Sequence, residues 1–96
     1  MERIPCVYLL ASGQNGTLYL GVTGDLVKRV WQHRGKFVDG FPARYETSRL
    51  VWFETHPTME AAILRENQLK KWKRSWKLEL IEGENPTWRD LYPELF

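Results

Sequence analysis

The sequence has few of the residues that build disulfides and metal clusters. It contains one cysteine, Cys6, and two histidines, His33 and His56. A single cysteine cannot form an intrachain disulfide, and a cysteine-based zinc site is not expected. The two histidines are too few and too far apart in the sequence to indicate a histidine metal site. The chain also lacks a glycine-rich phosphate loop and a serine-nucleophile motif, so neither P-loop nucleotide binding nor serine hydrolysis is indicated.

Long hydrophobic runs are absent as well. No apolar stretch approaches the length that spans a membrane. Residues 1–10 lack the apolar run and the small-residue cleavage site of a signal peptide. The lone cysteine fits a reducing compartment. We therefore expect a soluble cytoplasmic protein that does not bind a membrane.

The composition is that of an ordinary small globular domain. The chain has 96 residues, with 43% hydrophobic and 27% charged residues, which predicts a single domain over 1–96. The net charge of +2 decides little by itself, so the placement of the cations matters more. The sequence does not set the oligomeric state, and a monomer is compatible with it.

Patterns along the chain predict three strands and three helices. Strand-forming residues cover 6–11, 18–22 and 49–55, and Asn15-Gly16 marks a turn between the first two. Helical patterns cover 25–34, 59–72 and about 75–81. The predicted fold is α/β in the α+β sense. It is a small three-stranded antiparallel sheet flanked by helices, in the order strand-strand-helix-strand-helix-helix.

The ends of the predicted elements carry recognisable signals. Thr23 or Asp25 is expected to cap the first helix and Thr58 the second. The C-terminal tail contains two prolines and is expected to fold back through Trp88, Leu91 and Phe96.

Two tyrosines lie on the predicted hairpin. Side chains alternate between the faces of a strand, so an even-numbered loop, such as Ser12–Asn15, would place Tyr8, Tyr19 and Gly21 on one face. An odd-numbered loop would separate them. Tyrosine is also common in strands, where its hydroxyl finds a nearby acceptor, so packing is the alternative to a shared site.

Glu66 lies in the middle of an apolar helical stripe formed by Met59, Ala62, Ile63 and Leu69. An unpaired buried carboxylate costs several kcal/mol, roughly. Glu66 therefore needs a cation, a hydrogen-bond donor or a water-filled pocket. A structural ion pair with Arg29 or Arg44 and a functional site are both open interpretations.

Arg29 and His33 are four residues apart on the first predicted helix, so they share a face. Leu26 and Val30 form the adjacent apolar stripe, which places the pair at its edge. An arginine at such a rim can bind a phosphate through two parallel hydrogen bonds, and a histidine can move a proton near neutral pH. The alternative is a solvated helix face shared with Lys28 and Gln32.

Basic residues concentrate in the segment 65–77, where Trp72 and Trp76 are interleaved with them. Such a patch can follow a phosphate backbone while a tryptophan stacks on an unpaired base. A solvated helix end with core tryptophans is the alternative. The basic residues of this segment are Arg65, Lys70, Lys71, Lys73, Arg74 and Lys77.

Taken in order, these motifs resemble the GIY-YIG nuclease domain, and most closely its small stand-alone bacterial members. The two name-giving motifs correspond to "CVY", ending at Tyr8, and "YLG", Tyr19 to Gly21. The family's arginine, histidine and glutamate correspond to Arg29, His33 and Glu66. The helix "ENQLKKW" and the tail "NPTWRDL" extend the resemblance over nearly the whole chain.

The resemblance implies a divalent-metal-dependent endonuclease that hydrolyses DNA phosphodiesters. Glu66 would bind Mg²⁺ (or Mn²⁺), with water and phosphate in the other positions. Tyr19 would accept the proton of the attacking water, with Tyr8 supporting it or sharing that role. Arg29 would hold the scissile phosphate, and His33 would orient water or assist the proton transfer.

The sequence departs from the family pattern in places, first in reading Cys-Val-Tyr where the family has Gly-Ile-Tyr. Val22 stands where some family nucleases carry a lysine, and Asn85 is a weak match to an asparagine that some members place after the glutamate. A tyrosine has an ordinary pKa near 10, roughly, and needs help to act as a base at neutral pH. In the absence of a further DNA-binding domain, contacts should be mainly to phosphates. We expect them from Arg44, Lys70, Lys73, Arg74 and Lys77.

The leading hypothesis is therefore a DNA endonuclease, structure-selective or weakly specific, linked to DNA repair or processing. A non-catalytic nucleic-acid-binding module with the same fold is the alternative. A third hypothesis is a partner-binding subunit of repair complexes, which an exposed apolar patch around Trp52, Trp88 or Phe96 would support. The loop 35–48 is a further candidate to reach DNA, through Arg44 and Tyr45.

Overall fold

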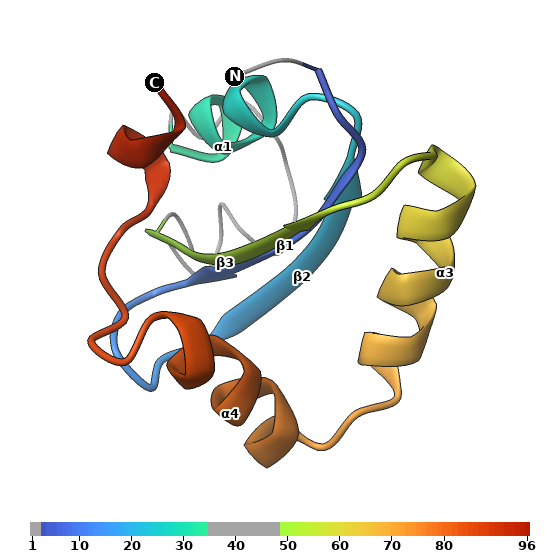
Figure 1. Ribbon diagram of the computed structural model, residues 1–96. Helices are drawn as coiled ribbons and strands as arrows, with labels where there is room; N and C mark the ends of the chain where they lie inside the picture. Colours follow the sequence, from blue (N-terminus) through green and yellow to red (C-terminus); the bar gives the residue numbers. More distant parts are fainter. Residues whose placement is uncertain (1–2, 35–48) are drawn as a thin grey trace.

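Three antiparallel strands form the centre of the fold (Figure 1). They are β1 (Cys6–Ala11), β2 (Leu18–Thr23) and β3 (Arg49–Thr55), in the spatial order β2-β1-β3. This computed structural model describes residues 3–34 and 49–96. The central strand β1 is buried along its whole length, whereas β2 forms one edge of the sheet.

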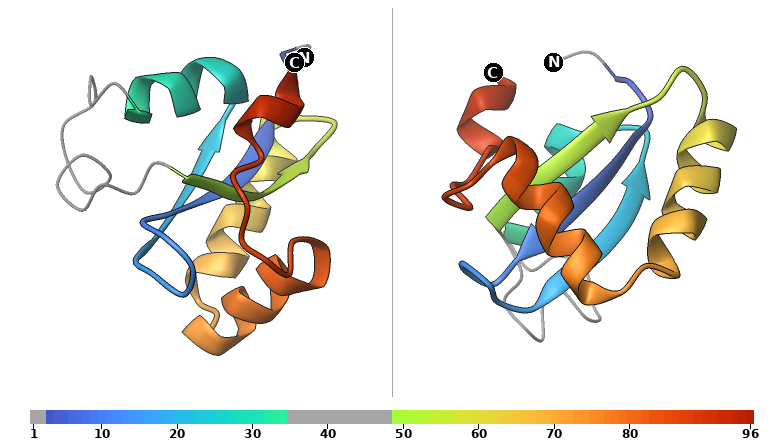
Figure 2. Two further views of the ribbon diagram at one scale, coloured as in Figure 1. Left: turned by 90° about the vertical axis from the view of Figure 1, so that its left-hand side faces the viewer. Right: turned by 60° about the horizontal axis from the view of Figure 1, so that its bottom comes forward.

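The helices divide between the two faces of the sheet (Figure 2). Helix α1 (Leu26–Arg34) and the short 3₁₀ helix η1 (Tyr92–Leu95) lie over one face. Helices α3 (Met59–Lys70) and α4 (Arg74–Glu84) lie over the other. The observed order and architecture confirm the predicted α+β fold.

Alternation along β1 produces a hydrophobic core on each side of the sheet. Val7, Leu9 and Ala11 face α3 and α4, whereas Tyr8 and Leu10 face α1. Tyr8 is thus a core residue of the α1 face.

An extra residue in β3 adjusts the packing on the α3 and α4 side. Leu9 pairs with Trp52 while Leu10 pairs with Leu50, so Val51 forms a bulge. Val51 and Trp52 consequently pack into the same core.

Side-chain caps set the start of two helices. Asp25 Oδ1 accepts a hydrogen bond from the backbone N–H of Lys28 at 3.2 Å, so Asp25 caps α1. Thr23 instead accepts from the N–H of Asp25 at 3.1 Å. Thr58 Oγ1 accepts from the N–H of Ala61 at 3.1 Å and caps α3, as predicted. Helix α3 ends at Lys70, earlier than predicted, and α4 extends beyond the predicted 75–81 on both sides.

Asn85 anchors the C-terminal tail to β3. Its Nδ2 donates to the carbonyl oxygens of Val51 (3.1 Å) and Arg89 (2.8 Å). Its Oδ1 accepts from the N–H of Arg89 at 3.1 Å. Asn85 is buried, and these bonds satisfy its polar atoms. Holding the tail on β3 is therefore enough to explain an asparagine at this position.

The tail then returns to the α1 side of the sheet. Trp88 is buried in the core under α4, and the N–H of Leu91 donates to the carbonyl of Leu50 at 2.8 Å. Leu95 is buried against the α1 face, whereas Phe96 is 78% exposed. The prediction that Phe96 anchors the tail was wrong, because Leu95 occupies that place.

Within 3–34 and 49–96, every helix is too short or too polar to traverse a lipid bilayer.

Candidate functional site

The hairpin places Tyr8, Tyr19 and Gly21 on one face of the sheet. Tyr8 pairs with Gly21, and Leu10 pairs with Tyr19. Paired residues share a face, and so do residues two apart on a strand. The connecting loop, 12–17, is longer than the expected Ser12–Asn15 but also has an even number of residues. The condition that the site hypothesis required is therefore met.

Gly21 provides the space in which the Tyr8 ring lies. A Cβ atom built on Gly21 would be 2.5 Å from both Cζ and the hydroxyl oxygen of Tyr8. Any side chain at this position would therefore displace the Tyr8 ring. The glycine of the second motif is explained by this close approach of ring and backbone.

His33 reaches the same place from α1. Its Nε2 lies 3.3 Å from the Tyr8 hydroxyl, and both side chains are buried. The His33 and Tyr19 ring centroids are 5.5 Å apart, and those of Tyr8 and Tyr19 are 6.3 Å apart. Tyr8, Tyr19 and His33 form one group of side chains, which we call the ring cluster.

Burial gives the members of the ring cluster different proton affinities. Burial, and next the neighbouring Tyr19, raise the pKa of Tyr8 far above its ordinary value, so Tyr8 keeps its proton at neutral pH. Burial, and next the positive charge of Arg29, lower the pKa of His33, so His33 is neutral there. A protonated Tyr8 can then donate to Nε2 of His33. The other ring nitrogen, Nδ1, is buried and has no hydrogen-bond partner within the described residues.

Arg29 lies on the flank of α1, beside its buried face. It lines a polar hollow with Arg3, Lys28 and Gln32 at the start of the helix. Its charge lowers the pKa of both His33 and Tyr8. A solvated face shared with Lys28 and Gln32 was the alternative considered for Arg29 and His33. No signal in the sequence pointed to Arg3, which precedes β1.

Glu66 approaches from the opposite side of the sheet. Helix α3 contacts β2 and β1, and β2 is an edge strand, so side chains from both faces can meet at this edge (Figure 1). The Glu66 side chain is 12% exposed, and its negative charge raises the pKa of Tyr8. Of its predicted stripe, Ala62 and Leu69 are buried, but Ile63 is 42% exposed.

Among the described residues, the ion-pair partner of Glu66 is Lys70, and not Arg29 as the structural alternative expected. Its Oε1 lies 3.5 Å from Nζ of Lys70, which is largely exposed. Because Lys70 is exposed and the contact is long, the pair is weak, so another cation can compete with Lys70 for the carboxylate. Within the described part of the chain, Glu66 makes no ion pair with Arg29, and Arg44 lies outside it.

The basic residues of segment 65–77 differ in what they contact. Arg74 Nη2 donates to the carbonyls of Asn15 (2.9 Å) and Gly16 (2.7 Å), so it fastens the β1–β2 turn to α4. Arg65 Nε donates to Glu54 Oε1 at 3.1 Å. Lys70, Lys71, Lys73 and Lys77 remain available to solvent to differing degrees. Arg44 and Tyr45 lie outside the described residues.

The tryptophans differ in how far they are buried. Trp72 is half-buried and packs against the core, whereas Trp76 is 47% exposed. Of the three residues named for an exposed apolar patch, Trp52 and Trp88 are fully buried, whereas Phe96 is 78% exposed.

Val22 and Asn85 lie away from the ring cluster. Val22 packs against the core on the α3 side, since it alternates with Gly21 along β2. Asn85 belongs to the tail beside β3, at the opposite edge of the sheet from β2.

Among residues 3–34 and 49–96, no cluster of three or more His, Cys, Asp or Glu side chains could hold a metal ion by itself. One carboxylate, Glu66, lies near the ring cluster. That donor set suits Mg²⁺, which is often bound through one or two carboxylates together with water and substrate phosphate.

The site therefore belongs to a class defined by two tyrosines on a hairpin, an arginine and a histidine on the following helix, and a carboxylate on a later one. Comparison with known proteins identifies this class. The model of the GIY-YIG catalytic domain matches residues 4–79. The chain belongs to the GIY-YIG nuclease family.

Small proteins from distant microorganisms are similar to this chain. A UPF0213 protein of Syntrophus aciditrophicus is 35% identical over 81 residues, covering 83% of this chain and 91% of the relative. A UPF0213 protein of Streptococcus sanguinis is 35% identical over 86 residues, covering 85% and 93%. One from Haloquadratum walsbyi is 37% identical over 70 residues, covering 69% and 74%. No solved structure matches the chain.

The contact between Tyr8 and Gly21 predicts that one added methyl group destabilises the protein at position 21 but not at position 24. Gly21→Ala should lower the free energy of unfolding by about 1–3 kcal/mol, because the Tyr8 ring must move. Gly24→Ala is the matched control, since its Cβ would meet only Met59 Cε at an ordinary 3.5 Å. It should change stability by less than about 0.5 kcal/mol or increase it slightly. Urea unfolding measures both, and equal effects would contradict the contact.

The lowered pKa of His33 predicts a loss of stability in mild acid. As the pH falls below the ordinary value of 6.5, the unfolded chain binds a proton at this histidine before the folded protein does. The stability contributed by His33 is thus complete above that pH and is lost as the pH falls toward its folded pKa. Urea unfolding at about pH 7.5 and 5.5 should show a smaller acid-induced loss in His33→Gln than in the wild type. An identical loss in both would refute the assignment.

Proposed function

We propose that this protein is a divalent-metal-dependent endonuclease that hydrolyses DNA phosphodiester bonds. The observation that carries the proposal is that two charges act on the ring cluster, Arg29 from the same helix as His33 and Glu66 from α3. Packing alone does not require two tyrosine hydroxyls, a neutral imidazole and opposite charges at one sheet edge. Hydrolysis of a phosphodiester uses each of them.

Tyr19 is the general base in this proposal. It is the less buried of the two tyrosines and lies edge-on to His33. Tyr8 is fully buried and keeps its proton, so it acts as a hydrogen-bond donor that orients His33. His33, being neutral, can orient the attacking water or pass on the proton that Tyr19 accepts.

Arg29 and Glu66 handle the charges of the phosphate. The guanidinium of Arg29 can donate two parallel hydrogen bonds to the scissile phosphate. Glu66 would hold the metal ion, and Lys70, its weak ion-pair partner, would then be released toward solvent. When bound, Mg²⁺ or Mn²⁺ stabilises the negative charge that grows on the phosphate during hydrolysis.

Lysines around the α3–α4 corner supply contacts to the DNA backbone. Lys70, Lys73 and Lys77 carry this role, whereas Arg74 is occupied by the hairpin carbonyls. Lys73 also lies over the Trp76 ring, with Nζ 5.7 Å from the centroid. Contacts to phosphates do not read sequence, so cutting is weakly specific or selective for DNA structure, as suits DNA repair or processing.

Removing the Glu66 charge should abolish cutting without unfolding the protein. Labelled single-stranded, duplex, flap and branched DNA, with RNA for comparison, would be incubated with Mg²⁺, Mn²⁺ or EDTA. Glu66→Gln should lower the cleavage rate by about two orders of magnitude or more, and Tyr19→Phe by about 10²–10⁴. Glu60→Gln, on the exposed first turn of the same helix, should cut normally.

Cutting that survives Glu66→Gln would overturn the metal assignment. Binding without any cutting in the wild type would overturn the enzyme and leave a non-catalytic nucleic-acid-binding module.

The lysine contacts predict a salt dependence. Lys73→Gln should weaken binding to all DNA sequences equally and reduce the slope of log K against log salt by about 0.9. Arg89→Gln, which removes an exposed cation paired with Glu94 in the tail, is the matched control and should leave the slope unchanged. Fluorescence anisotropy at several salt concentrations measures both. An equal change in the two variants would show that only net charge matters.

A further inference from the structure

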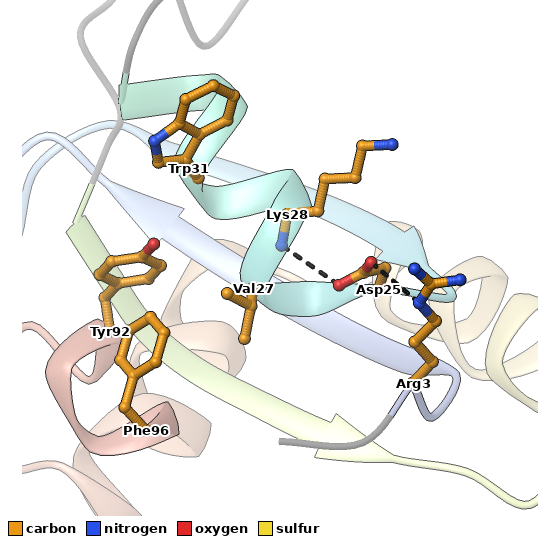
Figure 3. A pocket seen from close by; sticks show the side chains of 7 residues that line it. All are labelled: Arg3, Asp25, Val27, Lys28, Trp31, Tyr92 and Phe96. Atoms are coloured by element: carbon orange, nitrogen blue, oxygen red, sulfur yellow. Dashed lines mark hydrogen bonds and ion pairs between the residues drawn. The ribbon is translucent and has the colours of Figure 1, made fainter.

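A second hollow lies on the other flank of α1, where the C-terminal 3₁₀ helix packs beside it (Figure 3). Val27 and Trp31 of α1 form one wall, and Tyr92 and Phe96 form the other. Arg3 and Lys28 stand at one end. We call it the α1–η1 groove, and its volume of about 480 Å³ is within the range of ligand sites.

Its walls present aromatic rings to solvent. Phe96 is 78% exposed and Trp31 is 54% exposed, in a domain that buries Trp52 and Trp88 completely. The Phe96 ring stands edge-on to Tyr92, with centroids 5.3 Å apart and an interplanar angle of 84°. The guanidinium of Arg34 lies over Tyr92, 4.5 Å from its centroid, and also pairs with Asp90. These contacts hold the aromatic wall in place.

The groove joins the hollow that contains Arg29. Both are lined by Arg3, Asp25 and Lys28, so the two hollows adjoin at the start of α1. The Asp25 carboxylate lies 3.6 Å from Arg3 and caps α1, so the cations of the shared stretch outnumber its one anion. The path thus runs from a phosphate-binding arginine, past further cations, to exposed rings.

We propose that the α1–η1 groove binds an unpaired nucleotide segment of the DNA that is cut at the ring cluster. The proposal rests on the proposed nuclease function and names its substrate class: a duplex with a single-stranded extension or flap next to the scissile phosphate. Phosphates of the unpaired strand follow Arg3 and Lys28, and a base stacks on the ring of Phe96 or Trp31. Stacking accepts any base, so the groove selects strand structure and not sequence.

A further apolar groove, also formed by described residues, suits this role less well. It lies on α4 between Trp72 and Trp76, with Glu79 in its lining. It shares no lining residue with the hollow of Arg29. Trp76 is 47% exposed, which makes it a matched control for Trp31.

The test compares a short blunt duplex with the same duplex carrying an unpaired extension, by fluorescence anisotropy in EDTA. The wild type should bind the extended DNA about tenfold more tightly, as stacking of one base allows. Phe96→Ala and Trp31→Ala should each remove most of this preference, and Trp76→Ala should keep it. Circular dichroism would establish that each variant is folded.

Three results would overturn the proposal. They are the absence of a preference in the wild type, a preference that persists in both groove variants, and a preference lost only in Trp76→Ala. Self-association of the wild type that Phe96→Ala abolishes, without any preference for extended DNA, would make the groove a protein interface instead. Cleavage in Mg²⁺ is scored separately. A preference for extended DNA without cutting would refute the nuclease activity but support nucleotide binding in the groove. Cutting without a preference would support the nuclease activity and refute nucleotide binding in the groove.

Discussion

The position of the Tyr8 ring is the constraint on which the rest of the site depends. The ring starts from the central strand, lies on the backbone of Gly21 in β2 and reaches His33 in α1. It therefore joins three elements through one buried side chain. Because His33 fixes α1 against the sheet, it also fixes Arg29 one turn earlier on the same helix. A bulkier residue at Gly21 would disturb all of these positions together.

Burial gives different roles to the two tyrosines, which the sequence alone does not distinguish. Tyr8 is buried and keeps its proton, His33 is kept neutral by burial and by Arg29, and Tyr19 remains partly accessible. The charged groups stay at the rim, Arg29 on one flank of α1 and Glu66 across the edge strand. A neutral interior bordered by opposite charges avoids the cost of burying an ion and leaves Arg29 and Glu66 able to act on a phosphate and a cation.

Local patterns predicted most of the fold. Strand propensity located all three strands, and Thr58 was readable as a cap because its hydroxyl acts within one helical turn. A shared face for Tyr8 and Tyr19 was expected only if the hairpin loop had an even number of residues, and the observed register meets that condition. The contacts that sequence could not predict are long-range. They include Arg74 on the hairpin carbonyls, Asn85 on β3, and Leu95 in the place expected of Phe96. Each depends on where two distant segments meet, which no local period encodes.

The most direct test of the central claim is to locate the bound metal ion relative to the ring cluster. Paramagnetic broadening by Mn²⁺ can be followed by NMR in the isotopically labelled protein, with an uncleavable oligonucleotide present. The account predicts that resonances of Tyr19, His33 and Glu66 broaden first, and that Glu66→Gln removes this effect. Broadening that instead centres on residues far from the ring cluster, such as Glu79 of α4, and persists in Glu66→Gln would contradict it.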